Sequence, residues 1–446
     1  MKQKRISPAR LIAVGFLSVI AAGTLLLMLP VCHTGRTRIS FVDALFTAVS
    51  AVCVTGLNTL DPGLDFSTAG HAVIVLLIQI GGLGITSLGA GLVALFGGKL
   101  NQRENNLVKE ALNYPTFKDV MPLIRAVLTL TFVTELLGAA MAFCTFVREY
   151  PLGKAVWISV FHSVASFNNA GFDIFGCLQP GSSLQLFQSD PVVLLTLGLL
   201  IVVSGLGFFV WEEVIRLRQW KKLSVYTKLV LLMSVCLIIG GMAGFCILEW
   251  NNPATMGNMP WYDKLLNGFF QSVSTRTAGF DALGQGGLTE SGKALTIMLM
   301  FVGGSSGSTA GGVKTVTVMV LFLFLWSRIR RKGSVCVFGR SVPDNQVMDA
   351  MTIVSIVAAL ALFGGLFISA TSPVGFTDSL YESVSALATV GLTTGATASL
   401  SIPAQILIII YMYFGRVGVL TLSLGFLMGN QAQERFRYAH TNLLIG

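Results

Sequence analysis

The sequence predicts an all-α polytopic membrane protein, built from four pseudo-symmetric repeats of helix, re-entrant loop and helix. Three observations predict this fold class. The 446-residue chain is 53% hydrophobic and only 11% charged, with a mean hydropathy of +0.75, so it lacks the polar side chains to cover a soluble surface of that size. Eight apolar stretches are long enough to cross a bilayer, and a glycine motif recurs four times between them.

The eight stretches have few or no charges over about 20 residues or more, the length that crosses the hydrocarbon core as a helix. They are residues 11–30, 66–96, 123–147, 191–214, 229–249, 295–326, 350–370 and 403–428. The first follows basic residues, as the core of a signal peptide does, but it is long for one and the other spans follow it. We therefore predict eight transmembrane helices.

Basic residues are concentrated in the connections that lie inside if the N-terminus is cytoplasmic. These connections hold 21 of the 30 lysines and arginines, against six in the outside connections, which predicts that both termini are cytoplasmic. Because the charges stand between spans and not on one soluble face, the net charge of +9 does not indicate nucleic-acid binding. The seven cysteines form no C-x-x-C pair, so we expect buried thiols and neither a zinc site nor a disulfide framework.

One pattern recurs in the outside segment between the two spans of each repeat. About ten apolar, helix-compatible residues precede small and hydroxyl residues around one glycine, and an aromatic stands ten residues before that glycine. In the first, second and fourth repeats a valine follows this aromatic by three residues. The third repeat matches that aromatic and valine pair only if its helix is shifted by one residue, to Phe270 and Val273. The glycines are Gly56, Gly171, Gly279 and Gly391, separated by 115, 108 and 112 residues. This period is a whole structural unit and predicts repeats at residues 1–98, 99–222, 223–333 and 334–446, the last with a short cytoplasmic tail.

The pattern is typical of a short re-entrant helix followed by a turn back outward. Irregular backbone at membrane depth is tolerated only where protein or a water-filled cavity surrounds it. Four such pore loops can surround a central pore, and the carbonyls before each glycine can then replace the hydration shell of a cation. Glycine suits this place because it adopts positive φ without steric cost. The alternative is that these glycines only let helices pack closely, which does not account for the shared aromatic.

Five motifs carry a family resemblance. They are Val-Thr-Gly-Leu at 54–57, Asn-Asn-Ala-Gly-Phe at 168–172, Arg-Thr-Ala-Gly-Phe at 276–280, Thr-Val-Gly-Leu at 389–392, and the glycine- and serine-rich run at 303–314. With them the chain resembles, over essentially its whole length, the membrane subunits of the Trk, Ktr and HKT superfamily of potassium transporters. Eight spans without an additional N-terminal pair favour the bacterial Ktr type over the longer Trk type.

The resemblance implies a potassium filter to which each repeat contributes one quarter, with K+ bound by backbone carbonyls and no organic cofactor in this chain. The filter residues would be Val54, Thr55, Gly56, Asn169, Ala170, Gly171, Thr277, Ala278, Gly279, Thr389, Val390 and Gly391. The resemblance also implies a homodimer with one pore per protomer in the bacterial cytoplasmic (inner) membrane, a cytosolic nucleotide-binding ring of the RCK type as partner, and sodium-dependent activity. Because Asn168, Asn169 and Arg276 break the symmetry, we expect weaker discrimination of K+ from Na+ than four identical segments would give.

The sixth span is interrupted by a polar, glycine-rich decapeptide of low helix propensity, residues 303–312. Unsatisfied backbone there would be costly in lipid, so we predict a gating loop that plugs the cavity below the filter. Arg416 lies inside the eighth span, where an unpaired arginine costs about 2.5–3.5 kcal/mol, and we expect it to reach the carbonyls and serines of the loop. The gate residues would be Gly303, Gly304, Ser305, Ser306, Gly307, Ser308, Thr309, Ala310, Gly311, Gly312, Lys314 and Arg416. The alternatives are a packing kink, a snorkelling Arg416, and Lys314 as a charge at the inner mouth.

Three acidic residues, Asp43, Asp263 and Asp378, stand near the starts of the predicted pore helices. An acid at a helix N-terminus interacts favourably with the helix dipole, so capping is one interpretation. An outer ring that attracts cations is the other.

These features together predict potassium uptake through an ion-conducting pore. An alternating-access cation symporter is the alternative, but such folds usually show inverted or paired repeats. Residues 303–307 also match the G-x-S-x-G of a hydrolase, a motif that needs a strand-to-helix turn and a later acid and histidine, whereas the only later histidine is His440 in the tail. We therefore predict that the chain is not an enzyme. No soluble segment is long enough for a nucleotide-binding fold, so gating signals must come from another polypeptide.

Overall fold

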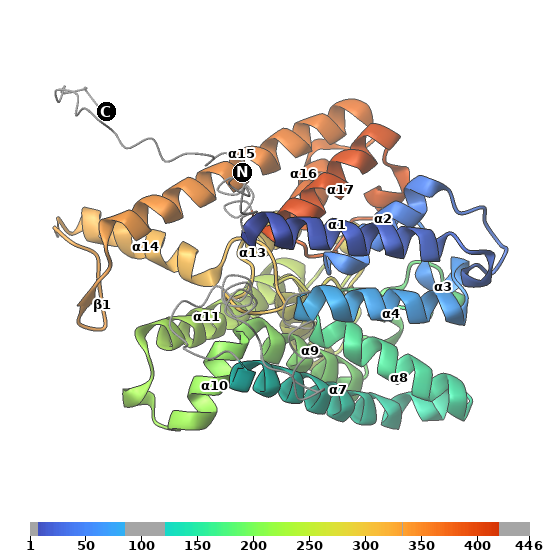
Figure 1. Ribbon diagram of the computed structural model, residues 1–446, viewed down its shortest axis with the longest axis horizontal. Helices are drawn as coiled ribbons and strands as arrows, with labels where there is room; N and C mark the ends of the chain where they lie inside the picture. Colours follow the sequence, from blue (N-terminus) through green and yellow to red (C-terminus); the bar gives the residue numbers. More distant parts are fainter. Residues whose placement is uncertain (1–7, 85–120, 332, 419–446) are drawn as a thin grey trace, which may run out of the picture.

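We describe residues 8–84, 121–331 and 333–418 of a computed structural model. Almost all regular structure in these residues is helical, which confirms the predicted all-α class for them. The short strands β1 (Cys336–Val337) and β2 (Arg340–Ser341) pair in an antiparallel hairpin after α14 (Thr315–Ile329), at the edge of the molecule in Figure 1. The short connecting elements are α3 (Pro62–Asp65), η1 (Pro30–Cys32), η2 (Phe175–Cys177), η3 (Ser183–Phe187), η4 (Trp220–Lys222), η5 (Gln285–Gly287) and η6 (Ala396–Ser399).

Four of the described helices are each long and apolar enough to cross a membrane. They are α1 (Pro8–Leu27), α7 (Met121–Glu149), α11 (Val225–Glu249) and α15 (Asp344–Thr371), and they correspond to the first, third, fifth and seventh predicted spans. Large apolar side chains such as Leu136, Ile239 and Leu366 are more than half exposed on them. Exposed large apolar side chains on helices of this length and hydropathy are typical of faces that contact lipid. The chain is therefore a multi-pass membrane protein.

Two of the predicted spans, the fourth and the sixth, are broken, whereas the sequence predicted a break only in the sixth. The fourth predicted span is not one helix, because α9 (Pro191–Leu206) and α10 (Phe208–Leu217) meet at 89°. Gly207 allows this bend with a φ of 89°. In the sixth span, α13 (Glu290–Phe301) and α14 are separated by the predicted loop. The helices α4 (Thr68–Leu83) and α17 (Ile402–Val417) end at Gly84 and Gly418, also at positive φ, and the remainders of their predicted spans lie outside the described residues.

Each repeat also contains a short helix whose buried face is set by the aromatic noted in the sequence. These helices are α2 (Phe41–Val52), α8 (Leu152–Phe167), α12 (Trp261–Ser274) and α16 (Phe376–Leu387). Phe46, Phe161 and Tyr381 are fully buried on three of them. On α12 the fully buried aromatic is Phe270, with Val273 also buried, while Phe269 is only partly buried. The one-residue slip predicted for the third repeat is thus confirmed.

Contacts between helices follow chain order and close on themselves. The groups α1, α2, α4, then α7, α8, α9, then α11, α12, α13, and finally α15, α16, α17 each pack together (Figure 1). The second long helix of each group contacts the short helix of the next: α4 with α8, α9 with α12, α13 with α16, and α17 with α2. The four groups therefore surround a common centre, and the loops that follow the short helices meet there.

The expectation of buried thiols is wrong for four cysteines. Cys144, Cys177, Cys236 and Cys336 are exposed, and none of the seven forms a disulfide. Cys144 lies on α7 and Cys236 on α11, helices that cross the membrane. An outward position on such a helix faces hydrocarbon, where a small apolar side chain is as acceptable as it is in a core.

Candidate functional site

The four segments after the short helices share an unusual backbone conformation. Each glycine of the motif has a positive φ, between 66° and 99°. The residue two positions earlier is also left-handed, with a φ of 56° at Val54, 58° at Asn169, 71° at Thr277 and 52° at Thr389. A β-branched residue in this region is a genuine outlier, and such strain costs on the order of 1–3 kcal/mol per residue and gathers at functional sites. This second left-handed position was not predicted from the residue pattern.

The four glycines form a closed ring. A Cβ built on any of them would lie closer than 3.0 Å to a backbone carbonyl oxygen of the next segment, so no side chain fits there. The glycine and carbonyl pairs are Gly56 with Ala170, Gly171 with Ala278, Gly279 with Val390, and Gly391 with Thr55. Each segment therefore abuts the next in chain order, and the fourth abuts the first.

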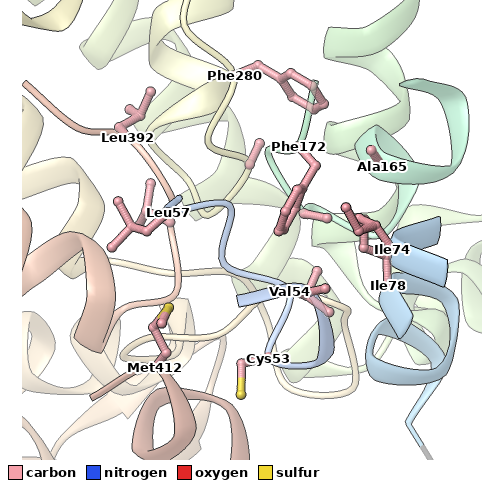
Figure 2. Close-up of a cluster of buried hydrophobic side chains, with 14 of the residues drawn as sticks. Cys53, Val54, Leu57, Ile74, Ile78, Ala165, Phe172, Phe280, Leu392 and Met412 are labelled. Atoms are coloured by element: carbon pink, nitrogen blue, oxygen red, sulfur yellow. The ribbon is translucent and has the colours of Figure 1, made fainter. Parts of the chain in front are cut away.

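Buried side chains and serine hydroxyls anchor the backbone of this ring to the surrounding core. The apolar residue after each glycine is at most 1% exposed: Leu57, Phe172, Phe280 and Leu392, which come from the four segments in Figure 2. In repeats one and four the glycine N–H donates to a serine on the preceding helix, Gly56 to Ser50 Oγ at 3.0 Å and Gly391 to Ser385 Oγ at 3.1 Å. The segments are thus anchored in the core by the residues next to the glycines, and the glycines themselves add no side chain to the ring.

All four glycines line one cavity of about 550 Å³, which we call the vestibule. Three carboxylates line it as well: Asp61, Asp173 and Asp281. Each accepts backbone N–H groups, for example from Gly63 to Asp61 at 2.9 Å and from Phe175 to Asp173 at 3.2 Å. The three carboxyl groups are therefore held in place at the mouth of the ring. These three residues were not predicted from the sequence, although Asp173 and Asp281 both stand two positions after their glycines.

The three acids that the sequence analysis singled out do not line the vestibule. Asp43 forms a capping box with Ser40 at the start of α2, as the capping interpretation predicts. Asp263 is 4% exposed and accepts from Ser189 Oγ at 2.8 Å. Asp378 pairs with Lys293 Nζ at 2.9 Å. Their roles are structural in this conformation, and the interpretation as an outer ring is wrong for them.

The loop at residues 303–312 lies against the side of the ring away from the vestibule. A Cβ on Gly311 would be closer than 3.0 Å to Thr389 Oγ1, and Asn169 Nδ2 donates to Thr309 Oγ1 at 3.2 Å. The loop therefore contacts the segments that follow α8 and α16. The two ends of the loop are joined by the hydrogen bond from Gly303 N to Val313 O at 2.9 Å.

Two partly buried cations hold consecutive carbonyls of this loop. Arg416 donates to Thr309 O and also to Gly81 O and Gly82 O at the end of α4. Lys314 Nζ donates to Ala310 O at 2.7 Å. Among the described residues neither cation forms an ion pair, so their positive charges are balanced only by carbonyl dipoles beneath the ring.

The serines of the loop bond elsewhere than the sequence suggested. Ser305 Oγ donates to Gly205 O and Leu206 O at the bend between α9 and α10, and Tyr226 Oη donates to Ser306 O at 2.8 Å. The predicted contact of Arg416 with the serines is therefore replaced by contacts with carbonyls. Ser305 also follows a helix and not a strand, so the hydrolase motif lacks the strand-to-helix turn that it requires.

Comparisons with known proteins agree with this architecture. A family model described as TrkH, cation transport protein, matches residues 9–436. The potassium/sodium uptake protein NtpJ of Enterococcus hirae is 35% identical over 449 residues, covering 100% of this chain and 98% of that protein. The Ktr system potassium uptake protein B of Bacillus subtilis is 36% identical over 437 residues, covering 98% and 96%.

The crystal structure of the potassium transporter TrkH from Vibrio parahaemolyticus matches the fold with a TM-score of 0.71 at 20% identity, covering 95% of this chain and 86% of that one. The resemblance carried by the filter and loop motifs is thus confirmed. Since the matching family consists of transporters, the chain is not a hydrolase. The chain belongs to the TrkH family of cation transport proteins.

Proposed function

We propose that this chain takes up potassium across the cytoplasmic membrane through a pore formed within a single chain. The observation that carries the proposal is the closed ring, in which each glycine abuts the carbonyl of the next segment. Two relatives that cover nearly the whole chain are named for potassium uptake. A ring that opens on one side to an acidic vestibule and is covered on the other by a loop has the parts of a filter and a gate.

In this mechanism the ring replaces the water that surrounds a potassium ion. Alternate left-handed residues turn successive carbonyls toward the axis, where they coordinate the ion as its hydration shell is removed. The filter residues are those at positions 54–56, 169–171, 277–279 and 389–391. The two polar neighbours Asn168 and Arg276 make the quarters unequal, so a moderate preference for K+ over Na+ is expected.

The same proposal includes the full topology. Four repeats at residues 1–98, 99–222, 223–333 and 334–446 contribute eight spans around one pore, with both termini cytoplasmic. The cyclic contacts between helix groups support this arrangement. The inner halves of the second and eighth spans fall on residues 85–96 and 419–428, outside the described residues.

Gating is assigned to the loop and its two cations. Arg416 and Lys314 hold the loop under the ring, where their positive charges oppose the passage of a cation. A cytosolic nucleotide-binding ring of the RCK type would release the loop, and sodium would support activity. The relatives named for a Ktr system and for potassium/sodium uptake support a multi-component, sodium-linked transporter.

The test of the function is rubidium or potassium uptake by transport-deficient cells that express the chain, with and without sodium and a candidate ring subunit. Uptake that requires this chain is expected. Single-channel or vesicle flux then separates the pore from an alternating-access symporter, because a symporter saturates at a far lower turnover. Absence of K+ uptake at normal surface expression, with and without the ring, would exclude the proposal.

The vestibule predicts a dependence on pH. Burial, with the negative charge of Asp61 nearby, raises the pKa of Asp173 to about 7. Asp173 is therefore mostly neutral at about pH 6 and mostly charged at about pH 8, so uptake at low K+ should rise a few-fold over this interval as the carboxylate attracts cations. Asp173→Asn should flatten the rise. Asp43→Asn, which keeps a capping side chain outside the vestibule, is the control, and an unchanged pH profile in Asp173→Asn would contradict this role.

The partner proposal predicts a dimer. The family resemblance implies a homodimer that docks on a cytosolic ring, so chemical cross-linking of the detergent-solubilised protein should trap a species of twice the chain mass. The measurement is gel mobility combined with mass determination of the complex. A strictly monomeric protein that still shows regulated transport would refute the dimer.

A further inference from the structure

A carboxylate from an outer helix reaches the back of the second filter segment. Glu135 lies within α7 and is 6% exposed. Among the described residues it has no basic partner within ion-pair distance. An ionisable residue inside a membrane-spanning helix is costly and marks a functional position. The filter and gate described above leave this residue without a role.

Glu135 is instead held by two amide side chains. Asn168 Nδ2 lies 3.1 Å from Glu135 Oε1, and Gln79 Nε2 lies 3.3 Å from Glu135 Oε2. The same Asn168 nitrogen is 2.8 Å from Gln79 Oε1. Ser163 Oγ also donates to Glu135 O at 2.6 Å, which ties α7 to α8. Both carboxylate oxygens therefore accept a hydrogen bond, and Glu135 is the one member of the triangle that presents two acceptors. Among the described residues, Asn168 Oδ1 has no partner, so the triangle depends on the amide nitrogen of Asn168.

Asn168 connects this triangle to the filter. It is the C-cap of α8 and directly precedes Asn169, the left-handed residue of the second segment. Its amide has little room to move, since a Cβ on Gly82 would lie closer than 3.0 Å to Asn168 Oδ1. The corresponding residues three positions before Gly56 and Gly391 are Cys53 and Ala388, which are buried and have no amide to fix.

We propose that Glu135 is a positioning residue that sets ion preference by fixing the second filter segment through Asn168. The inference rests on the proposed function, since it concerns the selectivity of the same pore. Glu135 touches neither the ring nor the vestibule, so it acts only through Asn168. Its effect on selectivity comes from the orientation of the Asn168 and Asn169 backbone, and not from a contact with the ion.

Replacing Glu135 by glutamine, which has nearly the same shape, tests this role. In Glu135→Gln one acceptor becomes a donor, and the three amides can then all pair only if Asn168 rotates. We expect the ratio of K+ to Na+ uptake to fall on the order of tenfold, the size of effect that follows from a lost hydrogen bond to a charged group. The double substitution Glu135→Gln with Gln79→Glu restores two acceptors to the triangle. It should recover most of the ratio of K+ to Na+ uptake, whereas a general loss of stability would not be reversed by the second substitution.

Two further variants keep the test decisive. Asn168→Ala removes the link at its other end and should lower the ratio similarly, and combining it with Glu135→Gln should add little. Glu149→Gln, at the exposed end of the same helix, is the matched control and should leave the ratio unchanged. Each is compared at equal surface expression, and if Glu135→Gln does not reach the membrane, Asn168→Ala decides.

Different results would overturn the proposed function and the positioning role of Glu135. A wild type that takes up no K+ overturns the proposed function, and this inference with it. A selective wild type whose ratio survives both Glu135→Gln and Asn168→Ala overturns the positioning role alone, as does a double exchange that recovers nothing.

Discussion

Gly279→Ser is expected to lower the preference for K+ over Na+ by about tenfold or more while the protein still inserts. Gly279 has a φ of 79°, and a Cβ there would lie closer than 3.0 Å to Val390 O. It would also lie 3.1 Å from the Cα of Gly171 and 3.2 Å from that of Gly391. The ring can admit a side chain only by widening or by turning the Val390 carbonyl away. Either change favours ions that are less well matched to the original ring.

The measurement is the ratio of K+ to Na+ uptake at matched surface expression. Gly375→Ser is the control, because a Cβ at Gly375 meets nothing within 4 Å and its φ is negative. Serine is also a favourable N-cap at that position, the start of α16. Unchanged selectivity in a well-expressed Gly279→Ser protein would falsify the filter assignment.

Replacing residues 304–311 by two glycines is expected to raise cation flux in the absence of the regulatory ring, with filter selectivity largely kept. The loop contacts the ring at Asn169 and Thr389 but supplies none of the ring carbonyls. A short linker can bridge the gap because the ends are close: a Cβ on Gly303 would lie 3.2 Å from Gly312 Cα. If this variant transports no faster than wild type per folded protein, the gate lies elsewhere.

Arg416→Ala should loosen the same closed state. Its loss removes hydrogen bonds from a charged donor to Thr309 O and to the end of α4, each of roughly 1.5–3 kcal/mol, which corresponds to an increase in flux on the order of tenfold or more. Arg416→Lys separates charge from geometry. A lysine keeps the positive charge but lacks the fork that reaches several carbonyls at once, so it should resemble alanine if the hydrogen bonds hold the loop, and wild type if the charge alone blocks the pore.

Features that repeat along the chain were open to prediction from the sequence. The four glycines share an offset from an aromatic, and even the slip to Phe270 was visible because the buried face of a helix imposes its own period. The loop at 303–312 was visible because its composition is incompatible with a helix.

Features that depend on contacts between repeats were not open to prediction. The bend at Gly207 depends on the loop, since Phe208 N donates to Gly307 O at 3.0 Å, and one glycine in an apolar run carries no such signal. The left-handed Val54 and Thr389 contradict local preference and are imposed by the ring. Asp61, Asp173 and Asp281 meet in the vestibule from three different repeats, at sequence offsets that are not all equal.

The closed ring has a consequence for how such a protein can change over generations. In a pore made of four identical subunits, one altered codon changes all four quarters at once, and a harmful change is multiplied fourfold. Here the four segments are encoded at separate places in one gene, so one segment can change while the other three stay the same. The residues Val54, Asn169, Thr277 and Thr389 already differ among the four segments, so under the proposed filter assignment ion preference would be adjusted in steps of one quarter.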